Sequence, residues 1–66
     1  MIKVTEWYKN NEGKMIESNI PHYVDSVEKL IDLIVNVFDE TIIMERNNKI
    51  KVKDYNGDIR FYVLPN

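Results

Sequence analysis

The chain has 66 residues, of which 44% are hydrophobic and 30% are charged, and its formal net charge is −2. This length supports only one small core, and this composition is typical of a folded protein rather than a disordered one. The sequence contains no cysteine, which excludes disulfide bonds and thiolate metal sites. We therefore expect a single domain over residues 1–66 that is stabilised by packing.

The sequence gives no indication of export or of membrane insertion. Residues 1–7 lack the apolar run and the small-residue cleavage site of a secretory signal. The longest apolar-rich stretch, 27–38, contains Asp32 and Asn36 and is shorter than the roughly 20 residues that a membrane span needs. We expect a cytoplasmic protein with no membrane partner. Frequent Ile, Asn, Lys and Tyr, whose codons are rich in A and T, suggest an origin in a bacterium or in its phage or prophage.

A β-hairpin is predicted at the start of the chain. Residues 2–8 alternate β-branched and aromatic side chains with polar ones, which favours a half-buried strand. The sequence Asn-Asn-Glu-Gly that ends at Gly13 is typical of a hairpin turn, because glycine readily takes a positive φ. The return strand would occupy residues 14–20 and end at Pro21, which has no N–H to donate.

The strongest periodic signal is an amphipathic helix near the middle of the chain. Asp25 or Ser26 can cap its start, and Glu28 can complete a capping box with Asp25. An apolar stripe with the 3.6-residue period must then be buried. The stripe consists of Val27, Leu30, Ile31, Ile34, Val35 and Phe38, and is widened by Leu33 and Val37. Asp39 and Glu40 follow the helix, where we expect a solvated turn.

Three strand-like runs follow the helix, at residues 41–46, 49–55 and 58–64. The dipeptide Asn56-Gly57 is a strong signal for a two-residue hairpin turn. That turn would place Ile50, Val52, Ile59, Phe61 and Val63 on the side of the helix. It would place Lys49, Lys51, Lys53, Tyr55, Arg60 and Tyr62 on the other side.

The register of residues 41–46 is less constrained. A two-residue turn at Asn47 and Asn48 would put Ile43 inward. A three-residue loop would instead put Ile42 and Met44 inward. We favour the first arrangement, which leaves Ile42 and Met44 on the uncovered face.

Together these elements predict an α+β fold. It consists of an antiparallel sheet of about five strands, built from the β-hairpin and a three-stranded meander, with the one amphipathic helix packed on one face. The other face and both edges of the sheet remain uncovered. Such surfaces are common places for a partner or for a second copy to bind.

Catalytic and cofactor motifs are not visible in the sequence. His22 is the only histidine and is expected in the loop before the helix, and no Ser-His or Cys-His arrangement can be assembled around it. Gly13 and Gly57 are isolated, so no phosphate-binding loop is present. The spacing of His22 and the carboxylates matches no metal site. We therefore expect no enzymatic activity, no catalytic residues, no cofactor and no metal.

Charge is distributed unevenly along the chain. Residues 24–40 carry a net charge of −4, residues 41–66 carry +2, and residues 1–23 are neutral. The molecule should therefore be dipolar, acidic on the helix and basic on the uncovered sheet face.

One of Trp7 and Tyr8 must face the core, because neighbouring residues of a strand point to opposite sides. Tryptophan in a small domain is usually a core anchor, so we favour Trp7.

The sequence thus favours a small non-enzymatic interaction module that binds a protein partner or itself, as a homodimer, through the uncovered face or an edge strand. The candidate face consists of Ile42, Met44, Lys49, Lys51, Lys53, Tyr55, Arg60 and Tyr62. The alternative is a nucleic-acid-binding accessory or regulatory protein, in which lysines of this face meet phosphates and tyrosines stack on bases. The overall pI of about 5.2 counts against the alternative.

Overall fold

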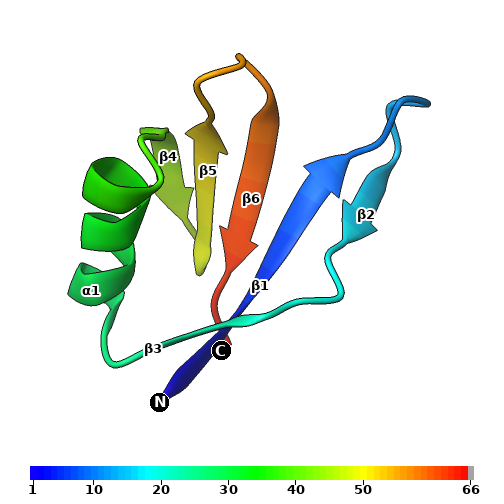
Figure 1. Cartoon of the computed structure of the whole chain (residues 1–66). Coiled ribbons are helices and arrows are strands. Elements are labelled where there is room, and N and C mark those ends of the chain that lie inside the picture. Colours follow the sequence, from blue (N-terminus) through cyan, green and yellow to red (C-terminus); the bar gives the residue numbers. More distant parts are fainter. Residues whose placement is uncertain (66) are drawn as a thin grey trace.

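The computed structural model describes residues 1–65 and confirms the α+β fold, with one open antiparallel sheet and one short helical segment (Figure 1). The strands of the described residues are β1 Ile2–Lys9, β2 Met15–Glu17, β3 His22–Val24, β4 Thr41–Arg46, β5 Lys49–Lys53 and β6 Ile59–Val63. Their order in the sheet is β2-β1-β6-β5-β4, and β3 also pairs with β1. The sheet therefore has one strand more than the sequence predicted.

The additional strand comes from the segment that was expected to be one return strand and a loop. β2 pairs with the end of β1, and β3 pairs with its beginning, so that Val4 faces His22. The chain leaves the sheet after Glu17 and rejoins it immediately after Pro21. The prediction that His22 lies in a loop was therefore wrong, because pairing resumes once the proline has been passed.

The helix begins as predicted but changes its winding halfway. Ser26, rather than Asp25, is the N-cap, and its hydroxyl accepts a hydrogen bond from the backbone N–H of Lys29 at 3.1 Å. The α-helix α1, Val27–Asp32, continues directly into a π-helical turn, η1, Leu33–Val37. A π-turn holds more residues than an α-turn and rotates the side chains that follow it. Consequently Val35 and Val37, predicted on the buried stripe, are 46% and 63% exposed.

The two-residue turn between β4 and β5 forms as predicted, but β4 contains a bulge. Asn47 and Asn48 have φ values of 52° and 62°, as a type I′ turn requires. The register then shifts between Ile42 and Met44. Because the bulge absorbs Ile43 as an extra residue, Ile42 lies opposite Val52 and faces the helix, and the predicted inward position of Ile43 was wrong.

The hairpin between β5 and β6 differs from the prediction by one residue. Val52 lies opposite Arg60 and Lys51 lies opposite Phe61, because the loop has three residues instead of two. Asp54, the residue before the loop, stabilises it, because its Oδ1 accepts hydrogen bonds from the backbone N–H groups of residues 56 and 58, each at 2.9 Å. Gly57, at φ 89°, then takes the left-handed third position of this loop type.

This shift of one residue exchanges the two faces of β6. Arg60 and Tyr62 point toward the helix instead of away from it, and Tyr62 is only 1% exposed. Ile59, Phe61 and Val63 point to the uncovered face. The inward and outward sets predicted for β6 were therefore reversed, whereas those predicted for the lysines and apolar residues of β5 were correct.

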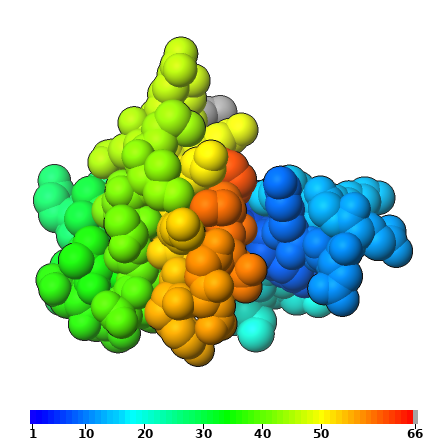
Figure 2. Space-filling model, turned by 90° about the horizontal axis from the view of Figure 1, so that it is seen from above, coloured from blue at the N-terminus to red at the C-terminus, as the bar shows by residue number. Residues whose placement is uncertain are grey.

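The core lies between the helical segment and one face of the sheet. Its buried apolar side chains are Val4, Val24, Leu30, Ile34, Ile50, Val52 and Tyr62. Figure 1 shows the helical segment beside the β4–β6 part of the sheet, while the β1–β2 hairpin extends beyond it. Seen from above, the N-terminal hairpin projects from one side of the molecule (Figure 2). The face of the sheet opposite the helix is left open.

Candidate functional site

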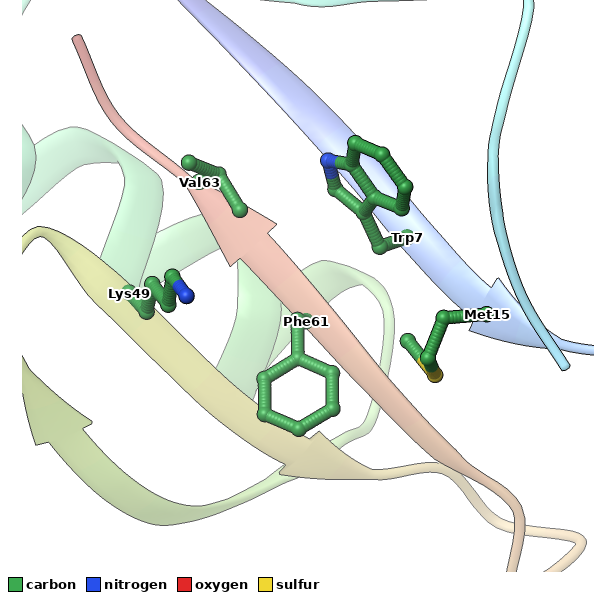
Figure 3. A pocket seen from close by; sticks show the side chains of 5 residues that line it. All are labelled: Trp7, Met15, Lys49, Phe61 and Val63. Carbon is green, nitrogen blue, oxygen red and sulfur yellow. The ribbon is translucent and has the colours of Figure 1, made fainter.

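The open face has an aromatic pair at its centre. Trp7 on β1 and Phe61 on β6 are directly opposite each other in the sheet register, and opposed side chains of antiparallel strands lie on the same face within contact range. Both side chains are half-buried. The sequence had favoured Trp7 as a core anchor, but the indole lies on the face opposite the helix, as Figure 3 shows with the helix ribbon behind the sheet.

The pair forms part of an open hollow of about 400 Å³. The hollow is lined by Trp7, Met15, Lys49, Phe61 and Val63. These residues belong to β1, β2, β5 and β6, and their side chains lie on one side of the sheet (Figure 3). Met15 follows the first hairpin turn, and Val63 lies opposite Thr5 and Lys49 in the register. Hollows of this size can accept a small planar or apolar group.

Cationic side chains predominate on the face that bears the aromatic pair. Strand alternation and register place six of the nine Lys and Arg residues of the chain on the open face. They are Lys3, Lys9, Arg46, Lys49, Lys51 and Lys53. Among the strand residues of the described chain, Glu17 is the one carboxylate on this face, opposite Trp7. The formal charge of the face is thus +5 in a chain whose net charge is −2.

The predicted interaction face is therefore only partly brought together. Met44, Lys49, Lys51 and Lys53 lie on the open face, as expected. Ile42, Arg60 and Tyr62 point to the helix side, for the reasons of bulge and register given above. Tyr55 lies in the β5–β6 loop and is exposed.

The sequence reasoning missed the residues at the centre of the face: Trp7, Met15, Phe61 and Val63. A signal for them was present. Asn10 and Asp54 are each followed three residues later by glycine, and both side chains hold the same kind of loop. Treating the two hairpins alike would have given the second one a three-residue loop and placed Phe61 outward.

The helix side of the sheet contains a cluster of charged side chains centred on Arg60. Its Nη2 forms an ion pair with Glu40 Oε2, and its Nη1 donates a hydrogen bond to Glu6 Oε2 at 3.2 Å. The guanidinium Nε is 3.8 Å from Asp54 Oδ2. Glu40, expected in a solvated turn, is instead only 3% exposed. Arg60, on β6, therefore contacts three carboxylates from different parts of the chain: Glu6 on β1, Glu40 between the helical segment and β4, and Asp54 in the loop after β5.

Tyr62 and His22 complete this cluster. The Tyr62 hydroxyl donates a hydrogen bond to Glu40 Oε1 at 2.6 Å, and burial raises its pKa from 10.0 to about 12. The Nε2 atom of His22 lies 3.0 Å from Glu6 Oε1, and its ring packs against Phe38 and Tyr62 with centroid distances of 5.9 and 5.8 Å. These carboxylates are thus occupied by partners within the protein.

A second, polar hollow of about 570 Å³ lies between the two hairpin loops. Its lining includes Glu6, Asp54 and Arg60, but His22 is not among its lining residues. Glu6 and Arg60 are already paired with each other there. Within residues 1–65, no group of three or more histidine or acidic side chains is arranged to hold a metal ion.

None of the helices in the described part of the chain is both long and apolar enough to cross a membrane. Comparison of the sequence with models of protein families and with curated proteins, and of the fold with solved structures, gives no match. The function must therefore be argued from the open face and the charged cluster themselves.

Proposed function

We propose that this protein is a non-enzymatic interaction module that binds an anionic partner on the open face of its sheet. The observation that carries the proposal is that, among the strand residues of the described chain, the face that bears the Trp7–Phe61 pair carries six cations and one carboxylate. Since the whole chain has a charge of −2 and this face +5, the remainder carries −7. Such separation attracts and orients an anionic partner. A cytoplasmic setting in a bacterium or phage remains part of the proposal.

The cations of this face are free to meet an external partner. Among residues 1–65, the ion pairs engage Arg60 and His22 on the helix side, and none engages a lysine of β5. The half-buried apolar side chains of the open face add an apolar area that water solvates poorly. An exposed apolar patch with a charged border is typical of an interaction site.

A second copy of the chain fits this face poorly. In a symmetric dimer the same patch occurs on both subunits, so two faces of charge +5 would meet. The edge strand β4 is also less suitable, because it has a bulge at Ile43 and ends in Glu45 and Arg46. Bulges and charges are devices that discourage pairing at sheet edges.

The proposal is tested by chromatography on a polyanionic matrix such as heparin. We expect the protein to be retained at low salt despite its net negative charge, and to elute as screening increases. The double variant Lys49→Glu/Lys51→Glu should pass through unretained.

The matched control is Lys14→Glu/Lys29→Glu, which makes the same change of net charge, from −2 to −6, at exposed positions outside the open face. We expect this variant to be retained. If the unmodified protein is not retained, or if both double variants lose retention equally, the open face is not the anion-binding surface.

A further inference from the structure

Resting on the proposed function, we infer that the anionic partner is a single-stranded nucleic acid whose bases stack on Trp7 and Phe61 while its phosphates lie along the lysines of β5. The inference depends on three features of the open face: the spacing of the lysines, the distance from them to the rings, and the combination of lysines with aromatic rings.

The lysines of β5 form a regular row. Lys49, Lys51 and Lys53 alternate with the buried Ile50 and Val52, so successive lysine side chains leave the strand about 6.8 Å apart, which is two strand residues. A stacked single strand carries one phosphate per about 3.4 Å of its axis. The row therefore repeats at twice the axial spacing of the phosphates, and a strand that lies along β5 can place a phosphate beside each lysine.

The aromatic pair lies at a distance from this row that suits the bases. Phe61 is on the strand next to β5 and Trp7 is on the one after that, about 5 and 10 Å from β5 in the plane of the sheet. A nucleotide whose phosphate is held at the row then extends its base across β6 toward β1. Lys49 lines the hollow together with both rings, so a cation is available where phosphate and base meet.

The chemistry of this face distinguishes a nucleic acid from an acidic protein. Lysine is depleted in the centres of protein interfaces, yet here it lies beside the aromatic pair. Aromatic rings on the open face of an antiparallel sheet, with cations around them, are the usual means of binding unpaired bases. A duplex keeps its bases stacked inside, so the two rings would have no base to contact. A strand with unpaired bases can contact both the aromatic rings and the lysines of this face.

Trp7 is the one tryptophan of the chain, which makes it a direct reporter. We expect addition of an oligothymidine of about ten nucleotides to quench its fluorescence at low salt. The affinity should fall with salt, with a slope on a log–log plot of about −2 if three phosphates are held, since each contributes about −0.7 for single strands. A duplex of the same length should neither bind as tightly nor quench the fluorescence.

Two variants separate the roles of the row and the rings. Lys49→Glu/Lys51→Glu should weaken binding by tenfold or more and reduce the magnitude of the slope by about 1.4, the contribution of two phosphates. Phe61→Leu keeps an apolar side chain but removes one stacking surface, and it should weaken binding about fivefold or more with an unchanged slope. The control Lys14→Glu/Lys29→Glu should bind within about twofold of the unmodified protein.

Polyglutamate, a polyanion without bases, distinguishes failure of this inference from failure of the proposed function. If polyglutamate and heparin bind the open face and the oligonucleotide does not, or binds without quenching Trp7, the partner is an acidic protein surface and the inference is overturned. Equal binding of duplex and single strand would also overturn it. If no polyanion binds, the proposed function fails as well.

Discussion

The two faces of the sheet differ in how they accommodate charge. On the helix side, Arg60 is surrounded by carboxylates, and Glu40 is buried because a cation and a hydroxyl satisfy it. On the open face, the strand residues of the described chain carry six cations and one carboxylate. Burial of a charge is tolerated only with partners at hand, whereas exposed charges of one sign remain available. The first face therefore serves stability, and the second is the face that we propose for binding.

Removal of Arg60 gives the largest expected effect on the helix side. Arg60→Met leaves Glu40 buried without its cation, and loss of one partner of a buried pair costs about 3–5 kcal/mol. We expect the free energy of unfolding to fall by that amount, measured by urea denaturation followed by circular dichroism.

The double variant Glu40→Gln/Arg60→Met serves as the control for this prediction. It removes the uncompensated charge of Glu40, and the glutamine carbonyl at position 40 can still accept a hydrogen bond from the Tyr62 hydroxyl. We expect it to be more stable than Arg60→Met alone. A double variant as unstable as the single one would mean that packing of the arginine side chain, rather than the charge of Glu40, is what matters.

The Tyr62 hydroxyl gives the next effect. Tyr62→Phe removes the hydrogen bond to Glu40, and a bond to a charged acceptor contributes about 1.5–3 kcal/mol. The pH dependence follows from burial of the hydroxyl. Because the folded-state pKa of Tyr62 is raised from 10.0 to about 12, the neutral hydroxyl stabilises the fold fully below pH 10, and this contribution is lost as the pH rises through about 12.

Unfolding measured at several alkaline pH values checks this pH dependence. The slope of stability against pH in this range should be smaller in Tyr62→Phe than in the unmodified protein. An unchanged slope in Tyr62→Phe would show that the hydroxyl titrates alike in both states.

A smaller effect is expected from the inward side of β5. Ile50 is completely buried, and Ile50→Val removes one methylene group from the core, which costs about 0.5–1.5 kcal/mol. Thermal unfolding should show the corresponding fall in midpoint. No fall in midpoint would place Ile50 outside the packed core.

The smallest effect on stability is expected from the neighbouring residue on the opposite side of the same strand. Lys51→Ala should change the free energy of unfolding by no more than about 0.5 kcal/mol, as is usual for surface substitutions. The same substitution should nevertheless weaken retention on heparin. A large loss of stability in Lys51→Ala would contradict the assignment of the open face to binding.

Much of the fold could be predicted from the sequence because its signals are local. The helix start, both hairpins, the Asn47-Asn48 turn and the alternation in β5 each depend on residues within a few positions of one another. The dipolar arrangement of charge also follows from those elements. What could not be predicted is the π-turn and the bulge, which depend on how the segments pack once they meet.

The candidate site was predicted less well than the fold, and for one physical reason. The face of every side chain in β6 depends on whether its loop has two or three residues. Asn56-Gly57 favours two residues, but the Asp54 side chain binds backbone N–H groups on the far side of the loop and fixes three. The pairing of Glu40 with Arg60 joins positions 20 residues apart, for which no sequence pattern gives a signal.

The alternation along β5 has a consequence for how this protein can change over generations. Ile50 and Val52 belong to the core, whereas Lys49, Lys51 and Lys53 lie on the open face and do not contribute to the core. Substitutions at positions 49, 51 and 53 can therefore accumulate at little cost to folding. The binding that we propose for this face can therefore diverge quickly between descendants, while the scaffold beneath stays the same.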